Sequence, residues 1–466
     1  MVFSSIFFIF TFLPIILGVY YIVPRKIKNL ILLIGSLVFY AWGEPVYIFL
    51  MIFTTIFNYI MARFIDKTDK VSYRRIQLIT TLVVDLLILG FFKYWGLVVE
   101  TVNNLFSTSF EYTQLALPIG ISFYTFQTLS YVIDVYLEKV KVQKNIISFG
   151  TYITMFPQLV AGPIVKYSDI EVQLEGRKET INLFGEGVER FIIGLGKKVL
   201  LANNIGLLWN TIQSQDFGEL SVLTAWLGAI AYTMQIYFDF SGYSDMAIGL
   251  GKMFGFEFME NFNYPYISKS VTEFWRRWHI SLSTWFKEYV YIPLGGNRHG
   301  VLKQCRNLLI VWALTGLWHG ANYNFIVWGL YYGVLLMFEK FIFKKALDKL
   351  PSIIRRIYTM IIVIIGWIFF AAPNLGWAID YIKVLFLGGG NSFIDSNFLY
   401  YLSNNFMLLI ILFIASTPLL NKVFVKIKNM DNILYVISII IEILIFIVVI
   451  SYLLNASYNP FLYFRF

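Results

Sequence analysis

The chain has 466 residues, of which 58% are hydrophobic and 14% are charged, and its mean hydropathy is +0.68. A soluble protein of this length needs more polar surface, so we expect most of the chain to face lipid or a buried helix bundle. The net charge of +9 would suit a nucleic-acid partner, but the distribution of the basic residues gives that class no support. The single cysteine, Cys305, excludes an intrachain disulfide.

Apolar runs of about 20 residues, the length that crosses a bilayer, recur along the whole sequence. The first run lacks a preceding basic segment, so we expect a spanning helix there and no cleavable signal. Long runs lie at 5–23, 46–62, 77–96, 117–137, 183–202, 222–240, 323–339, 354–371, 406–424 and 432–454, and shorter runs lie at 29–42 and 307–319. The sequence therefore predicts an all-α polytopic membrane protein with about 11 to 12 transmembrane helices.

The stretch 148–165 is apolar but is interrupted by Pro157, Gly162 and Pro163. Broken backbone at membrane depth is tolerated only where protein or a cavity shields it. We therefore expect a re-entrant segment that dips into the membrane and returns to the same side.

The lysines and arginines predict the orientation, because cytoplasmic loops of membrane proteins are enriched in them. Of the 37 basic residues, 31 fall in alternate loops, and the intervening loops 97–116, 203–221 and 372–405 contain only Lys383. A single alternation of cytoplasmic and extracytoplasmic loops fits the whole chain if the re-entrant segment does not cross the membrane. It predicts that both termini lie outside the cytoplasm.

One predicted spanning helix ends in a polar segment that carries Gln235, Asp239 and Asp245. Gln235 and Asp239 are four residues apart and are expected on one face of the helix. The two carboxylates can be structural acceptors that tie helix ends to basic residues, or they can pair with Arg276, Arg277 or a cation. A proton-coupled transporter would also place carboxylates here, so transport is an alternative function.

The segment from Phe274 to Tyr289 repeats aromatic residues at three- and four-residue steps, with basic residues beside the stripe. A tryptophan-rich amphipathic helix of this kind lies at the membrane interface, and His279 would point inward. The stripe comprises Trp275, Trp278, His279, Leu282, Trp285, Phe286 and Tyr289, and the flanking basic residues are Arg276, Arg277 and Lys287. A two-glycine turn follows and ends at Arg298, whose guanidinium could meet a phosphate.

Two of the three histidines, His279 and His319, lie beside hydrophobic runs. A titratable side chain at membrane depth is costly and indicates a functional site. An imidazole can also accept and donate a proton near neutral pH. His319 lies at the tip of a predicted hairpin, where Gly316 and Gly320 would let a substrate approach the backbone. His299 is expected to be exposed on a basic loop, and His279 has the alternative role of a structural imidazole bonded to a backbone carbonyl.

These segments resemble the membrane-bound O-acyltransferase family, and more closely its bacterial branch typified by the alginate O-acetyltransferase membrane subunit. The resemblance extends from residue 39 to residue 466. It rests on the blocks FYAWGEP, LPIGISFYTFQTLSYVIDVY, FPQLVAGPIVK, QIYFDFSGYSDMAIGLG, FWRRWHISLSTW, YIPLGGNR, LTGLWHGANYNFIVWG and SYNPFLYFRF. It places the family's catalytic histidine at His319 and its second functional histidine at His279. YIPLGGNR and SYNPFLYFRF favour this branch over the D-alanyl-lipoteichoic-acid branch, which shares WRRWHIS.

The resemblance implies one membrane domain over 1–466, with N-terminal helices at 1–137, a catalytic core at 138–343 and C-terminal helices at 344–466. Its fold would be a funnel around a thin central partition. The acyl donor would be cytoplasmic, either acetyl-CoA or an acyl-carrier thioester, and no cofactor or metal is expected to stay bound. An extracytoplasmic SGNH-type partner acyltransferase would modify a polymer hydroxyl.

The predicted function is O-acetyl transfer across the cell membrane to an extracellular polysaccharide or cell-wall polymer. His319 would be the general base, and His279 would orient the thioester or stabilise developing charge. The expected supporting residues are Asn322, which would hold the imidazole tautomer, and Trp318, Trp275, Trp278, Arg276, Arg277, Arg298, Asp239, Asp245 and Gln235. The alternatives are D-alanyl transfer of the lipoteichoic-acid type and transport of acyl groups or polysaccharide, although the sequence shows no internal repeats of the kind typical of transporters.

Overall fold

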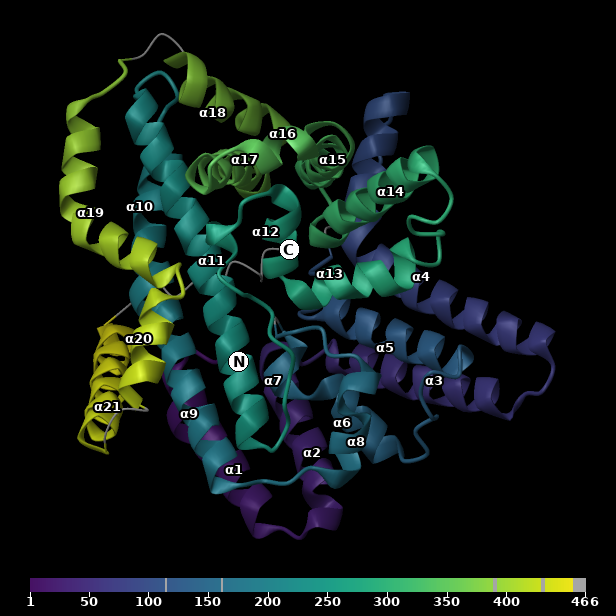
Figure 1. The fold of residues 1–466 in the computed structure, drawn as a ribbon. Helices are drawn as coiled ribbons and strands as arrows, with labels where there is room; N and C mark the ends of the chain where they lie inside the picture. The colour runs from purple at the N-terminus through teal and green to yellow at the C-terminus, as the bar shows by residue number, and fades with distance from the viewer. Residues whose placement is uncertain (114, 161, 389–391, 429–431, 456–466) are drawn as a thin grey trace. The chain divides into compact units, whose positions relative to one another are not determined.

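Every regular element of the computed structural model is a helix, and the described part of the chain contains no strand (Figure 1). The structure describes residues 1–113, 115–160, 162–388, 392–428 and 432–455. The chain divides into two compact units, Met1–Phe191 with Tyr243–Met259, and Ile192–Gly242 with Glu260–Phe466. The predicted all-α fold class is confirmed.

The first unit contains the N-terminal helices. They are η1 (Phe8–Phe12), α1 (Leu13–Ile22), α2 (Arg25–Gly43), α3 (Ile48–Lys67), α4 (Val71–Phe106), α5 (Ile121–Tyr136), α6 (Ile146–Thr154), α7 (Phe156–Leu159) and α8 (Tyr167–Gly176), with most of α9 (Ile181–Gly196) and the end of α11 (Val222–Met253). The predicted break near Pro157 is confirmed, because only the short helices α6 and α7 form there and their side chains are buried in protein.

The second unit contains the remaining helices. They are η2 (Lys197–Ala202), α10 (Asn203–Gln213), most of α11, η3 (Pro265–Ile267), α12 (Val271–Arg277), α13 (Ile280–Phe286), η4 (Lys287–Tyr291), α14 (Val301–His319), α15 (Tyr323–Phe338), η5 (Glu339–Phe343), α16 (Lys344–Lys349), α17 (Ser352–Ala371), α18 (Leu375–Leu387), α19 (Ser396–Ala415), α20 (Leu419–Lys428) and α21 (Asn432–Asn455). Side-chain caps begin α12, α18 and α19, where Ser270, Asn374 and Asp395 each accept a bond from a first-turn backbone N–H.

Eight helices in the described ranges are long and apolar enough to cross a membrane, and Phe8–Ile22 is a shorter apolar helix. The chain is therefore a multi-pass membrane protein. The predicted runs 117–137 and 222–240 form α5 and part of α11, whose side chains are almost all buried. Their polar residues are tolerated because they contact protein rather than lipid.

Two predicted segments near the C-terminus differ from the structure. The supposed loop 372–405 contains helix α18 and the first ten residues of α19. The single run predicted at 406–424 is also wrong, because α19 ends at Ala415 and α20 begins at Leu419. Pro418 lies between them, and proline lacks the N–H that would continue the helix.

Candidate active site

Helices α14 and α15 form a tight hairpin whose tip is the WHGAN segment. Helix α14 ends at His319 and α15 begins only four residues later, so the predicted hairpin is confirmed. A Cβ added to Gly329 would lie 2.2 Å from the Trp312 carbonyl oxygen, so the two helices pack backbone against backbone. This close contact fixes the position of the histidine at the end of α14.

The glycines beside His319 have a different role from the predicted one. A Cβ at Gly316 would lie 2.3 Å from the carbonyl oxygen of Phe325, and a Cβ at Gly320 would lie 2.2 Å from the ring of the same residue. The space over both glycines is therefore filled by α15 and is closed to a substrate. Gly316 and Gly320 serve helix packing.

We expect the variant Gly329→Ala to lose activity and stability together. The new methyl group would force the hairpin apart, and overpacking of this kind costs about 1–3 kcal/mol. Thermal unfolding in detergent and acyl-transfer assays would measure both effects. Gly90→Ala is the matched control, since a Cβ at Gly90 meets no atom within 4 Å. Equal stability of the two variants would contradict this account of the hairpin.

His319 is buried in an aromatic environment. Its side chain lies with its ring centroid 4.9 Å from Trp318, 4.9 Å from Trp328 and 5.2 Å from Phe370, and the residue is 4% exposed. The three ring contacts are all edge-to-face, which holds the imidazole in one orientation. Burial of a polar ring in such surroundings costs free energy, so an imidazole kept there is a candidate for a chemical role.

Three hydrogen-bond donors lie buried in one aromatic cluster, and one of them, on Trp328, belongs to a ring that contacts His319. The ring of Trp275 is 5.7 Å from Trp328 and 4.8 Å from Tyr332, centroid to centroid. In the described part of the chain, Trp275 Nε1, Trp328 Nε1 and Tyr332 Oη have no hydrogen-bond partner. A buried donor without an acceptor costs about 1–3 kcal/mol, so this cluster would favour the oxygen of a bound molecule or a water.

His279 interrupts the helix that the sequence predicted over this segment. Its backbone has φ +44°, the left-handed conformation, so α12 ends at Arg277 and α13 begins at Ile280. The expectation of one continuous amphipathic helix is therefore wrong. Periodicity alone could not show the break, since the aromatic repeat continues through it. The predicted inward orientation is confirmed, because His279 is 1% exposed.

The tautomer of His279 follows from its neighbour Asn261. The Asn261 Oδ1 atom accepts from the backbone N–H of Ser281 at 3.2 Å, so this side of the amide is the oxygen. The same oxygen lies 3.1 Å from His279 Nδ1, which must then carry a proton and donate. In the neutral ring, Nε2 is left as the basic nitrogen. Burial lowers the pKa of His279 to about 3, so the ring is neutral near pH 7.

This burial predicts an acid-labile fold. The folded ring stays neutral, whereas an unfolded histidine takes up a proton below its usual pKa of about 6.5. Lowering the pH from about 6.5 toward 3 therefore favours the unfolded state by about 1.4 kcal/mol per pH unit. His279→Asn keeps a left-handed backbone and a donor for Asn261 but cannot titrate. Chemical unfolding at several pH values should show that the free energy of unfolding falls more steeply on acidification for the wild type than for the variant. Parallel curves would contradict the prediction.

The two histidines approach the same tryptophan from different elements. The Trp318 ring is 6.0 Å from His279 and 4.9 Å from His319, centroid to centroid. A third aromatic side chain, Phe240 of α11, lies 4.7 Å from the His279 ring. Residues that are 40 positions apart in the sequence thus form one buried cluster, which is the candidate active site.

The three predicted supporting tryptophans all lie in the aromatic core of this unit. Trp318 contacts both histidines, Trp275 belongs to the donor cluster described above, and Trp278 packs 4.7 Å from Trp367 and 5.0 Å from Phe262. Asn322 does not contact His319 as predicted. Its Nδ2 atom donates to the Pro373 carbonyl oxygen at 3.1 Å, so it ties the hairpin tip to the end of α17.

The predicted basic residues lie at the edge of the unit. Arg276 is exposed, and Arg277 pairs with Glu273 at 3.0 Å and donates to the Asn263 carbonyl oxygen. Arg298 is exposed on the predicted glycine turn, where two successive glycines have positive φ. An exposed guanidinium on such a turn can meet an anion from solvent.

Asp239 and Gln235 share one face of α11, as predicted, and the contact of Asp239 with a basic residue fits its interpretation as a structural acceptor. Asp239 Oδ1 lies 2.6 Å from Lys198 Nζ, and both side chains are almost fully buried. Lys198 also donates to Asn203 Oδ1 at 2.8 Å. Gln235 packs against Gly206, where its amide fills the space that a Cβ would need.

Asp245 belongs to the first unit, where it pairs with Arg190. The Arg190 Nη2 atom lies 2.8 Å from Asp245 Oδ1, and Nε lies 3.1 Å from it. The basic residue that pairs with Asp245 is thus Arg190. The interpretation of Asp245 as a structural acceptor for a basic residue fits this contact.

Sequence reasoning missed two residues that shape the site. Lys198 interrupts a predicted apolar run, and a charge inside such a run is a signal that could have identified it. Asn261 precedes His279 by 18 positions in a loop, and no periodicity or motif connects the two.

Comparison with known proteins identifies the family of this chain. The model of the membrane-bound O-acyltransferase family matches residues 138–375, about half of the chain. The chain is 46% identical to the probable alginate O-acetylase AlgI of Pseudomonas aeruginosa, over 80% of this chain and 73% of the relative. It is 36% identical to the peptidoglycan O-acetyltransferase of Helicobacter pylori, over 82% and 79%. A teichoic acid D-alanyltransferase of Bacillus subtilis is 32% identical over 50% of this chain.

The chain belongs to the membrane-bound O-acyltransferase family and is an O-acyltransferase enzyme. Within that family it falls in the branch of the alginate O-acetylases.

Proposed function

We propose that this enzyme takes an acetyl group from a cytoplasmic thioester and passes it across the cell membrane for O-acetylation of an extracellular polysaccharide or cell-wall polymer. The observation that carries the proposal is the pair of buried imidazoles that both contact the ring of Trp318. The names of the relatives support the reaction type, since they are an alginate O-acetylase and a peptidoglycan O-acetyltransferase.

His319 is the proposed general base. The oxygen that attacks the thioester carbonyl loses its proton, a C–O bond forms and the C–S bond breaks. The imidazole accepts that proton and can return it to the thiolate leaving group, a contribution of about a hundredfold to ten-thousandfold in rate. The aromatic contacts that hold the His319 ring would keep it in position for this transfer.

His279 is the proposed positioning partner. With Nδ1–H bonded to Asn261, its Nε2 atom can accept a hydrogen bond but cannot donate one. This favours a role in orienting a hydroxyl or thiol over stabilising negative charge. The donors of Trp275, Trp328 and Tyr332 are better suited to the carbonyl oxygen of the acyl group, because they can donate to it.

The donor is proposed to be acetyl-CoA or an acyl-carrier thioester that enters from the cytoplasm past Trp275 and Trp278. Arg276, Arg277 and Arg298 would then lie on the side of the donor phosphates. An extracytoplasmic SGNH-type acyltransferase is the proposed partner that completes transfer to the polymer. The distribution of basic residues supports this orientation, with both termini outside the cytoplasm.

The sidedness of the reaction tests the proposal. Inside-out membrane vesicles should consume labelled acetyl-CoA, and right-side-out vesicles should consume it only after they are made permeable. Consumption by sealed right-side-out vesicles would contradict the cytoplasmic donor. Incorporation of D-alanine in place of acetyl groups would instead support the alternative acyl transfer, and uptake of intact polymer would support transport.

Arg298→Ala should raise the donor KM more than it lowers kcat. A contact with donor phosphate is the same in the ground state and in the transition state, so its loss weakens binding without slowing chemistry. Steady-state kinetics on the purified protein with its partner would measure the change. Arg75→Ala is the matched control, because Arg75 is also an exposed arginine that is predicted to be cytoplasmic. An unchanged KM would remove Arg298 from the donor site.

A further inference from the structure

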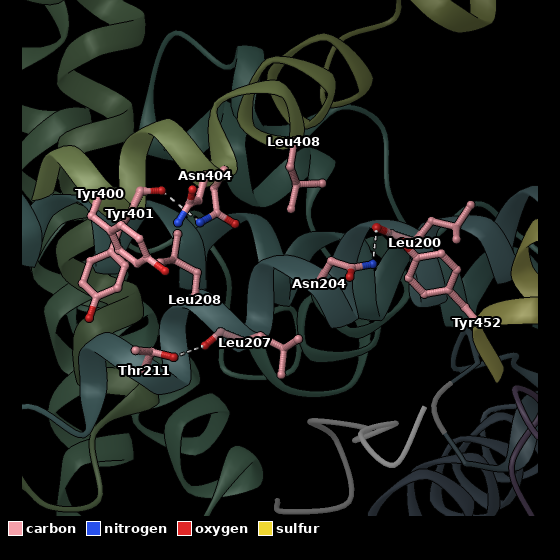
Figure 2. Close-up of a pocket in the computed structure, with 11 residues that line it drawn as sticks. Leu200, Asn204, Leu207, Leu208, Thr211, Tyr400, Tyr401, Asn404, Leu408 and Tyr452 are labelled. Atoms are coloured by element: carbon pink, nitrogen blue, oxygen red, sulfur yellow. Dashed lines mark hydrogen bonds between the residues drawn. The ribbon is translucent and has the colours of Figure 1, made fainter. Parts of the chain in front are cut away.

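The second unit contains a pocket separate from the histidine cluster, between α10, α19 and α21 (Figure 2). Its volume of about 480 Å³ is within the range of small-ligand sites, about 300–1,000 Å³. Tyrosines, asparagines, leucines and one threonine form its lining, and none of these lining residues is charged. An ionic ligand would therefore find no counter-charge in the lining.

The polar groups of the lining offer both hydrogen-bond acceptors and hydrogen-bond donors. The amide nitrogen of Asn204 donates to the Leu200 carbonyl at 2.9 Å, and that of Asn405 donates to the Tyr401 carbonyl at 2.9 Å. Each of these two amides keeps its oxygen for a ligand, and the second N–H of Asn405 and the amide of Asn404 can donate as well. Thr211 likewise donates its hydroxyl proton to its own helix, and Figure 2 shows this bond and that of Asn204. A ligand whose groups both donate and accept hydrogen bonds therefore fits this lining.

The remaining groups fit the same chemistry. The Tyr401 hydroxyl oxygen accepts from Gln215 Nε2 at 2.8 Å, which leaves its O–H free to donate. The side chains of Tyr400 and Tyr452 are 63% and 47% exposed, so their ring faces are accessible for stacking. A phosphate, a carboxylate or a lipid ester supplies only acceptors and would leave the amide oxygens unpaired. A sugar supplies a hydroxyl for each acceptor and one acceptor for Tyr401.

The pocket also lies near the expected side of the acceptor polymer. Most of its lining comes from α10, between Asn204 and Thr211, and from α19, between Tyr400 and Leu408. Helix α10 ends and α19 begins at the segments 214–221 and 392–395, which contain no basic residue and belong to the regions predicted to be extracytoplasmic.

We propose that this pocket binds an uncharged, hydroxyl-rich segment of the acceptor glycan. The placement of the pocket on the side of the acceptor polymer rests on the proposed function. The choice of an uncharged ligand rich in hydroxyls rests on the residues that line the pocket. The site would hold the polymer at the membrane surface, and it would favour neutral glycans over polyuronates.

Binding to the full-length protein in nanodiscs tests this proposal without any acyl donor. The probes are the neutral oligosaccharides cellohexaose and maltohexaose, an anionic mannuronate hexamer, and a glucosyl diacylglycerol. We expect at least one neutral hexasaccharide to bind at least tenfold more tightly than the anionic hexamer. Asn204→Leu/Asn405→Leu should weaken that binding at least tenfold, and Tyr400→Leu, at an exposed position, should weaken it as well. Ser403→Leu, on the same helix but outside the lining, should bind as the wild type does.

Three results would overturn the proposal. They are no binding of either neutral oligosaccharide, equal binding of the anionic hexamer, and undiminished binding by both pocket variants. Binding of the glycolipid alone would also overturn it, in favour of a lipid. Since no donor is present, these outcomes are independent of the vesicle assay, which reports separately on the proposed function.

Discussion

His319→Ala should abolish acyl transfer while the protein still inserts and folds. The imidazole is the proposed base, and loss of a general base lowers the rate by about a hundredfold to ten-thousandfold. The measurement is O-acetyl release from the polymer in cells that carry the variant, together with transfer by the purified protein. Alanine is smaller than histidine and is apolar, so the aromatic side chains around position 319 keep an apolar environment. We therefore expect the variant to be recovered from the membrane.

His299→Ala is the matched control for this experiment. His299 is an exposed histidine in the turn before α14, so its loss should leave transfer unchanged. Normal O-acetylation with His319→Ala would contradict its assignment as the base. An equal loss of acyl transfer with His299→Ala would show that the assay does not report on the buried cluster.

Lys198→Met should destabilise the protein more than any substitution that removes an exposed charged side chain. The variant deprives the buried Asp239 carboxylate of its counter-charge, which costs about 3–5 kcal/mol. The double variant Lys198→Met/Asp239→Leu should recover most of the loss, because both charges are then absent. Unfolding of the detergent-solubilised protein by heat or denaturant would give the three stabilities.

The ion pair of Lys252 with Glu186 provides the comparison. Its atoms are also 2.6 Å apart, but the two side chains are 23% and 57% exposed. A pair of this kind contributes about 0–1 kcal/mol, so Lys252→Met should have little effect. If the Lys198→Met variant were as stable as the Lys252→Met variant, the buried ion pair would not contribute to stability.

The sequence was sufficient to predict the helical hairpin and its buried histidine. The two apolar runs and the short WHGAN segment between them leave few other arrangements, since a hairpin loop must be short. The inward orientation of His279 was also predictable from its place on the aromatic stripe. These features depend on local periodicity, which a single sequence records.

The features that could not be predicted depend on contacts between distant residues. The left-handed backbone of His279 has no signature in a repeat that continues on both sides of it. Lys198 and Asp239 are 41 positions apart, and the sequence offered Asp239 several basic residues of equal plausibility. The packing role of Gly316 and Gly320 likewise depends on where Phe325 lies after the turn.

The close contact between α14 and α15 has a consequence for the order in which the protein assembles. Three residues join these helices, so their pairing is local and should occur early in synthesis. Phe370, which packs against the His319 ring, belongs to α17 and is made about 50 residues later. We therefore expect a nascent chain that ends after α16 to hold the paired hairpin with the imidazole still uncovered, and the site to close only when α17 has been inserted.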